Sequence, residues 1–214
     1  MKLKFFWIII LNLMISQGVA QALLEKGSVF IGGEAGLSFY NRELAYYSNQ
    51  LPQGFSMDDA LRASITPKIH YGIFKDLFVI GQLGFDYSNY KRQNDSRRYT
   101  FTNYRVGAGL KYYFFEITKP VFLSAETGIN YNYLQMNQRF LPLEKKSNML
   151  VSAYLDIGID LDLGEGWIFT IILKDLIEYQ SDTPNFKHRA GWKVNNVFKQ
   201  LIRYPHFSFL YKIK

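Results

Sequence analysis

Apolar and polar residues alternate along most of this chain. Between Val29 and Phe39 every second residue is apolar or small, and the residues between them are Gly, Glu and Ser, with Phe30 as the exception. A period of two is typical of a β-strand with one apolar and one polar face. The same pattern predicts seven strands, over residues 28–40, 61–73, 77–90, 99–114, 121–133, 149–163 and 206–214. The pattern therefore predicts an all-β protein.

Two places depart from this pattern. Residues 167–179 are rich in Ile and Leu but do not alternate cleanly, so a short buried helix stays open as an alternative to a strand. We interpret the segment as a strand because the strand that follows it needs a partner. Pro67 lies inside another predicted strand and has no N–H to donate, which predicts a bulge or a local break there.

The predicted strands are longer than those of most globular proteins. They exceed the usual length of about 5–6 residues, and a tilted strand needs only about 9–11 residues to cross a membrane. One face is apolar over whole strands, while the other carries charged residues. Backbone groups in lipid must pair internally, which favours a closed barrel. A soluble periplasmic β-sandwich or lipocalin-like carrier is the alternative, and it would require polar outward faces.

The connections between the predicted strands alternate in length. Residues 74–76, 116–120 and 164–166 are short links, whereas 41–60, 91–98, 136–148 and 178–204 are longer. Bacterial outer-membrane barrels show this sorting, with tight periplasmic turns and long extracellular loops. Aromatic residues near the strand ends predict a periplasmic girdle (Tyr112, Tyr113, Phe114, Phe115) and an outer girdle (Tyr87, Tyr90, Tyr131, Tyr133). In the last loop Val194, Val197, Phe198, Leu201 and Ile202 have helical spacing, which predicts a short amphipathic helix.

The first 22 residues have the features of a secretory signal. Lys2 and Lys4 precede an apolar run over residues 5–15, and Ala20-Gln21-Ala22 supplies small residues for cleavage near Ala20–Ala22. We expect residues 1–22 to be the signal peptide and residues 23–214 to be one barrel domain. Without Lys2 and Lys4 the formal charge falls from +7 to +5. The chain has no cysteine, which excludes disulfides and thiolate metal sites.

Two segments resemble a known family. Val106-Gly-Ala-Gly-Leu-Lys-Tyr-Tyr-Phe114, a short link, and then Val121-Phe-Leu-Ser-Ala-Glu-Thr-Gly-Ile-Asn-Tyr131 look like strands four and five of small outer-membrane barrels. The family is that of the OmpA transmembrane domain, OmpX and their porin-family relatives. The resemblance implies an eight-stranded antiparallel up-and-down barrel in the outer membrane of a Gram-negative bacterium, inserted by the barrel-assembly machinery. The chain departs from the family at its end, Tyr211-Lys-Ile-Lys214, where an aromatic last residue is usual.

Charged residues occupy the polar faces, which would point into the barrel. They are Glu34, Lys68, Asp86, Arg105, Lys111, Glu126, Asp156, Asp160 and Lys174. The interior of an eight-stranded barrel is just wide enough for side chains to fill, and buried charges must be paired. We therefore expect an internal polar network that fills the barrel. A narrow pore for small solutes is the alternative.

The last three long loops are strongly basic, with twelve Lys and Arg against four Asp and Glu. On the predicted topology they lie outside the cell, beside the phosphorylated headgroups of lipopolysaccharide. We hypothesise that Arg97, Arg98, Lys145 and Lys146 contact those phosphates. A merely solvated loop surface is the alternative. No recognition motif accompanies the charge, so nucleic acid is not an expected partner.

An enzymatic function is the remaining alternative, because some eight-stranded barrels modify lipid A with Ser and His. His206 and Ser208 lie two residues apart, but only six residues follow Ser208 and none of them is acidic. A nucleophile needs an oriented base, so we assign no catalytic residue. His70 and His188 are isolated, and neither a metal site nor a cofactor is expected. The sequence thus predicts a monomeric, non-enzymatic barrel with a structural or surface-interaction role.

Overall fold

The computed structural model describes residues 24–40, 57–92, 98–139, 145–182, 190–195 and 204–214. Within these ranges no helix is long and apolar enough to cross a membrane. The described residues form nine strands: β1 (Val29–Tyr40), β2 (Met57–Phe74), β3 (Leu77–Arg92), β4 (Arg98–Thr118), β5 (Val121–Arg139), β6 (Lys145–Gly164), β7 (Trp167–Gln180), β8 (Gly191–Val194) and β9 (His206–Lys212).

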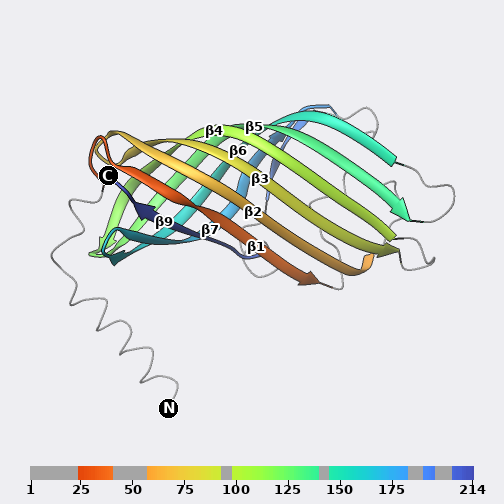
Figure 1. Cartoon of the computed structure of the whole chain (residues 1–214), viewed down its shortest axis with the longest axis horizontal. Helices are drawn as coiled ribbons and strands as arrows, with labels where there is room; N and C mark the ends of the chain where they lie inside the picture. Colours follow the sequence, from red (N-terminus) through yellow and green to blue (C-terminus); the bar gives the residue numbers. More distant parts are fainter. Residues whose placement is uncertain (1–23, 41–56, 93–97, 140–144, 183–189, 196–203) are drawn as a thin grey trace, which may run out of the picture.

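Eight of these strands close into an antiparallel barrel. Strands β1 to β7 pair in chain order, β7 pairs with β9, and β9 returns to β1 (Figure 1). The short strand β8 pairs with the same edge of β7 as β9 does, but at a position further along β7. It pairs with residues 177–180 of β7, whereas β9 pairs with residues 167–172. The predicted eight-stranded up-and-down barrel is confirmed.

Short turns gather at one end of the barrel. They join β2 to β3, β4 to β5 and β6 to β7, and Asp76 and Glu165 adopt left-handed backbone conformations in two of them, with φ of 63° and 51°. The C-terminus lies at this same end (Figure 1). The other connections, which include residues 41–56, 93–97 and 140–144, leave from the opposite end. We call the two ends the short-turn end and the loop end.

The strands extend further at the loop end than the sequence predicts. Arg98 lies in β4, and Lys145 and Lys146 begin β6, although all three were expected in loops. Alternation fails as a guide at this end, because both faces of a strand can be polar where both contact water, while the backbone ladder continues. Arg97 lies outside the described residues, as do four of the five residues of the predicted amphipathic helix. The fifth, Val194, ends the strand β8.

Residues 167–179 form a strand, and a bulge explains their irregular pattern. Leu155 of β6 faces Ile177 of β7, and Ile157 faces Leu173. Three β7 residues thus oppose a single β6 residue, and the second of the three, Asp175, has a φ of 51°. The consecutive residues Lys174 and Asp175 are both buried as a result. A bulge of this kind redirects side chains and removes the period of two.

At Pro67 the structure shows a local break without a bulge. Pro67 keeps its partner Gly33 on β1. On the other side neither Thr66 nor Pro67 has a partner on β3, but the register before and after them is the same. The missing proline donor therefore costs the ladder a local pairing and leaves its alignment intact.

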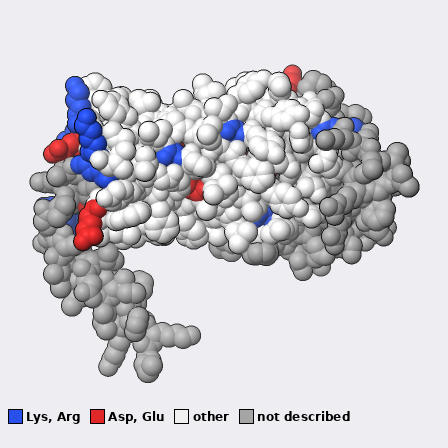
Figure 2. Space-filling model, viewed as in Figure 1, with Lys and Arg blue, Asp and Glu red and all other residues white. Residues whose placement is uncertain are grey.

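The outer face of the barrel is apolar over the middle of its length. Ile65, Leu83 and Ile129 lie on three different strands and are 57–61% exposed. Figure 2 shows a broad, mostly uncharged band on the visible face, with charged side chains gathered at the short-turn end. Side chains on the alternate positions point inward and are mainly polar, among them Glu34, Lys68, Ser124 and Asp160.

Candidate functional site: a filled polar interior

Glu34 on β1 is the centre of an ion-pair cluster inside the barrel. Its Oε2 lies 3.0 Å from Nζ of Lys68 on β2, and its Oε1 lies 2.6 Å from Nζ of Lys174 on β7. Nδ1 of His206, on β9, lies 2.8 Å from the same Oε1. One carboxylate therefore connects four strands. The side chain of Glu34 is fully buried, and a buried charge is tolerated only when it is paired.

Lys68 extends this cluster across the barrel to β5. Its Nζ lies 2.6 Å from Oε1 of Glu126, which also accepts a hydrogen bond from the Tyr154 hydroxyl at 3.0 Å. The Gln82 amide donates to the Tyr154 hydroxyl at 3.0 Å and to the Asn130 side-chain oxygen at 2.7 Å. Strands on opposite sides of the wall are thus connected through side chains.

A second cluster lies around Asp160 of β6. Nζ of Lys111 is 2.6 Å from Oδ1, and the Thr170 hydroxyl donates to the same oxygen at 2.6 Å. The Ser124 hydroxyl donates to Oδ2. The Asp160 side chain is fully buried, so these three donors replace the water that the carboxylate loses on folding.

The remaining charged residues predicted to point inward also lie in pairs. Nη2 of Arg105 is 3.2 Å from Oδ1 of Asp86. Asp156 lies 3.4 Å from Nζ of Lys174 and accepts a hydrogen bond from the backbone N–H of Asp175 at 2.6 Å. The structure thus brings all nine residues together in the interior. These contacts join residues 10 to 172 positions apart, and those of Glu34 with Lys174 and His206 depend on barrel closure.

Little space is left among these side chains. One cavity, between Arg105, Asn130 and Asp175, has a volume of about 20 Å³. Another, between Lys111, Asp156 and Ser208, has a volume of about 10 Å³. Each is about the size that one water molecule needs. At these two places the interior is packed with side chains, as expected for a barrel of eight strands.

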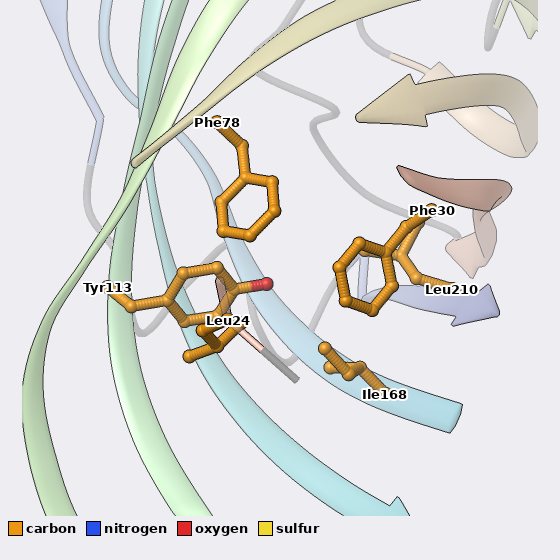
Figure 3. Close-up of a cluster of buried hydrophobic side chains, with 6 residues drawn as sticks. All are labelled: Leu24, Phe30, Phe78, Tyr113, Ile168 and Leu210. Carbon is orange, nitrogen blue, oxygen red and sulfur yellow. The ribbon is translucent and has the colours of Figure 1, made fainter. Parts of the chain in front are cut away.

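An apolar cluster inside the short-turn end was not predicted from the sequence. Figure 3 shows its side chains pointing toward one another across the barrel. They are Leu24, Phe30, Phe78, Tyr113, Ile168 and Leu210, with Phe122 packed against them. Phe30 and Phe78 meet edge to face, with ring centroids 5.6 Å apart. The available signal was Phe30, an apolar residue on an otherwise polar face.

Tyr113 was predicted to lie in the periplasmic girdle, and this prediction was wrong. Its side chain is only 6% exposed and packs inside the barrel. Tyr113 shares the inward face with Lys111, two residues before it, and the register shift comes only after Tyr113. Its neighbours Tyr112, Phe114 and Phe115 do face outward and are 45–58% exposed.

His206 and Ser208, the residues of the enzymatic alternative, both point inward and are buried. The structure supplies an acidic partner for His206 that the sequence order concealed, because Glu34 comes from the other end of the chain. The His206 ring lies against Gly36, where an added Cβ would be 2.6 Å from Cε1. Ser208 lines the cavity of about 10 Å³, which has no room for an acyl chain.

Within the described residues, no group of three or more His, Asp and Glu side chains is arranged to hold a metal ion.

A closed antiparallel barrel with an apolar outer face and a filled polar interior defines the class of transmembrane β-barrels. No protein-family model matches the chain, and no curated protein matches it. Solved structures with a similar overall shape include Neisserial surface protein A, with 14% identity, 88% of this chain and 100% of that chain covered, and a TM-score of 0.46.

Two further solved structures have comparable similarity. Ail of Yersinia pestis has 16% identity over 87% of this chain and 96% of its own, with a TM-score of 0.42. A major outer membrane protein of Thermus thermophilus has 10% identity over 86% of this chain and 99% of its own, with a TM-score of 0.43. Similarity at this level concerns barrel architecture and not activity.

Proposed function

We propose that this protein is an integral barrel of the bacterial outer membrane, without enzymatic activity, whose loop end binds the phosphate groups of lipopolysaccharide. The filled barrel is the rigid scaffold, and the interaction lies at its rim. The barrel-assembly machinery would insert it, and the barrel would act as a monomer.

The outer face supports the membrane part of this proposal. Large apolar side chains such as Ile65, Leu83 and Ile129 would be unfavourably exposed in water, at roughly 25 cal/mol per Å² of apolar surface. In a bilayer the same surface contacts lipid, and the closed ladder leaves few unpaired backbone groups in the wall.

The proposed binding of lipopolysaccharide rests on one observation, the pairing register of the strands at the loop end. Lys91 of β3 lies directly opposite Arg98 of β4, which lies directly opposite Arg139 of β5. Lys145 and Lys146 begin the next strand, β6. We call these five positions the basic rim.

The basic rim crosses four neighbouring strands, so basic residues recur at successive backbone positions along the loop end. A layer of phosphorylated headgroups is a matching partner for such a row, because each phosphate can accept charge-assisted hydrogen bonds from two or more basic side chains.

The experiment is to purify the protein from outer membranes and to measure the lipopolysaccharide that stays bound per barrel. The triple variant Lys91→Gln, Arg98→Gln, Arg139→Gln should retain several-fold less, and high salt should reduce retention by the wild type, because exposed charges are screened. The matched control, Lys26→Gln, Lys212→Gln, Lys214→Gln, removes the same charge from the short-turn end and should retain the wild-type amount. Equal retention by all three proteins would refute the lipopolysaccharide contact.

Two measurements test the scaffold. A folded barrel should migrate faster than the boiled protein on a detergent gel, whereas a protein that is soluble without detergent and migrates identically in both states is not a membrane barrel. Because the cavities between Arg105 and Asp175 and between Lys111 and Ser208 are each about the size of one water molecule, planar-bilayer recordings should show no stable conductance steps. Reproducible steps would instead support a narrow pore.

A further inference from the structure

A larger pocket lies at the short-turn end, outside the filled interior. Its volume is about 220 Å³, compared with about 20 Å³ for the cavity between Arg105 and Asp175. Pockets for drug-sized ligands have volumes of about 300–1,000 Å³. This pocket therefore suits a smaller group, such as one end of a ligand whose remainder lies elsewhere.

The pocket is held in shape by backbone hydrogen bonds. The N–H of Asp76, in the turn between β2 and β3, donates to the Leu24 carbonyl at 3.0 Å, and the N–H of Tyr113 donates to the Asp76 carbonyl at 2.9 Å. These bonds join the three parts of the chain that form the pocket. Leu24 and Tyr113, which line the pocket, also belong to the apolar cluster whose side chains Figure 3 shows.

The rim of the pocket carries both signs of charge. Lys75 and Asp76 come from the turn between β2 and β3, and Glu116 and Lys119 come from the end of β4 and the turn after it. Burial raises the pKa of the Asp76 carboxyl, Lys75 lowers it, and Glu116 raises it, so these groups lie close enough to interact. Two cations and two carboxylates on one rim match a ligand that also carries both charges.

The pocket adjoins the lipid-facing surface. Phe114 and Phe115 contribute to its lining and are 45% and 58% exposed on the outer side of the barrel. The register shift between Tyr113 and Phe115 lies at this point in the wall. A ligand with its polar group in the pocket could therefore lay an apolar tail along the outer face without leaving the bilayer.

We propose that this pocket binds the headgroup of a zwitterionic aminophospholipid, phosphatidylethanolamine, from the membrane leaflet at the short-turn end. Lys75 and Lys119 contact the phosphate, Asp76 and Glu116 contact the ammonium group, and the acyl chains lie against the exposed aromatic side chains. This inference rests on the proposed membrane location and does not depend on the lipopolysaccharide contact at the other end.

The experiment is native mass spectrometry of the detergent-solubilised protein, with phosphatidylethanolamine or phosphatidylglycerol added at equal concentration. The wild type should retain one phosphatidylethanolamine in preference to phosphatidylglycerol, which has the phosphate but no ammonium group. The variant Lys75→Gln, Lys119→Gln should lose at least about tenfold in affinity for phosphatidylethanolamine, because it loses two charged hydrogen-bond donors. The control Lys26→Gln, an exposed lysine at the same end that does not line the pocket, should bind as the wild type does.

Glu116→Gln separates the two halves of the site. It should reduce the preference for phosphatidylethanolamine while binding of phosphatidylglycerol stays the same or increases. Equal binding of the two lipids by the wild type, or unchanged binding by the double lysine variant, would overturn the inference. A gel of each sample, boiled and unboiled, distinguishes the two levels of failure. If the barrel is formed and lipid binding does not follow this pattern, only the pocket is refuted, whereas a protein that forms no barrel refutes the membrane location as well.

Discussion

Replacing Lys111 by Met removes the ammonium group that contacts Asp160 at 2.6 Å and leaves the carboxylate buried. The hydroxyls of Ser124 and Thr170 still donate to Asp160, but no positive charge then balances it within that contact. Breaking a buried ion pair by removing one partner costs about 3–5 kcal/mol. Asp160→Asn should cost a similar amount, because it leaves the buried Lys111 ammonium without its counter-ion.

The double variant Lys111→Met, Asp160→Asn removes both charges, so it should be less destabilised than either single variant. Replacing a whole buried pair by uncharged residues is often close to neutral. The double-mutant cycle should therefore give an interaction free energy of at least about 3 kcal/mol, at or above the upper end of the range for residues in contact. The exposed Lys26→Met serves as the control and should stay within about 0.5 kcal/mol of the wild type.

The assay is equilibrium unfolding in urea, in detergent–phospholipid micelles, followed by tryptophan fluorescence and by the fraction that migrates as a folded barrel. With a dependence of about 2 kcal/mol per molar urea, each single variant should lower the unfolding midpoint by about 1.5–2.5 M. Additive effects of the two substitutions, or single variants as stable as the Lys26→Met control, would refute the view that Lys111 and Asp160 form a buried ion pair in which each charge stabilises the other.

Three further predictions test other parts of the fold. Gly72→Ala places a Cβ 2.5 Å from the Glu25 carbonyl, so the segment that carries Leu24 must shift, and the urea midpoint should fall; an unchanged midpoint would mean that this segment is not docked. Ile129→Lys introduces a charge in the middle of the outer face and should cost about 2–4 kcal/mol in lipid, whereas Ile129→Leu should be neutral; equal stability of the two variants would contradict a lipid-facing position. Gly36→Ala should displace the His206 ring from Glu34, which is measurable as a changed His206 imidazole signal in NMR spectra; an unchanged signal would argue against that contact.

The faces of the strands could be predicted from the sequence, because alternation is a local property of the chain. Glu34, Lys68 and Asp160 were expected inside, and Leu83 and Ile129 outside, from the parity of their positions alone. A strand in a membrane barrel has one side toward lipid and one toward the interior. Apolar residues therefore indicate the outward side of the strand, and polar residues indicate the inward side. Where that contrast ends, at the loop end, the predicted strand limits were too short, and Arg98, Lys145 and Lys146 were assigned to loops.

The ion-pair partners of the interior could not be predicted in this way. Glu34 meets Lys174 and His206 because β7, β9 and β1 are neighbours in the closed wall, and nothing local to Glu34 indicates either partner. The same holds for the phospholipid pocket, which combines a turn after β2, the end of β4 and Leu24.

The sequence by itself determined seven of the strands, the faces of most of their residues and the basic character of one end, because each of these follows from residue type and spacing along a single segment. Only the tertiary structure decided which charges pair, where an apolar cluster closes the barrel and how the eighth position in the wall is shared between β8 and β9. The physical reason is that these features depend on register and closure, which are set by the summed pairing and packing of strands far apart in the chain.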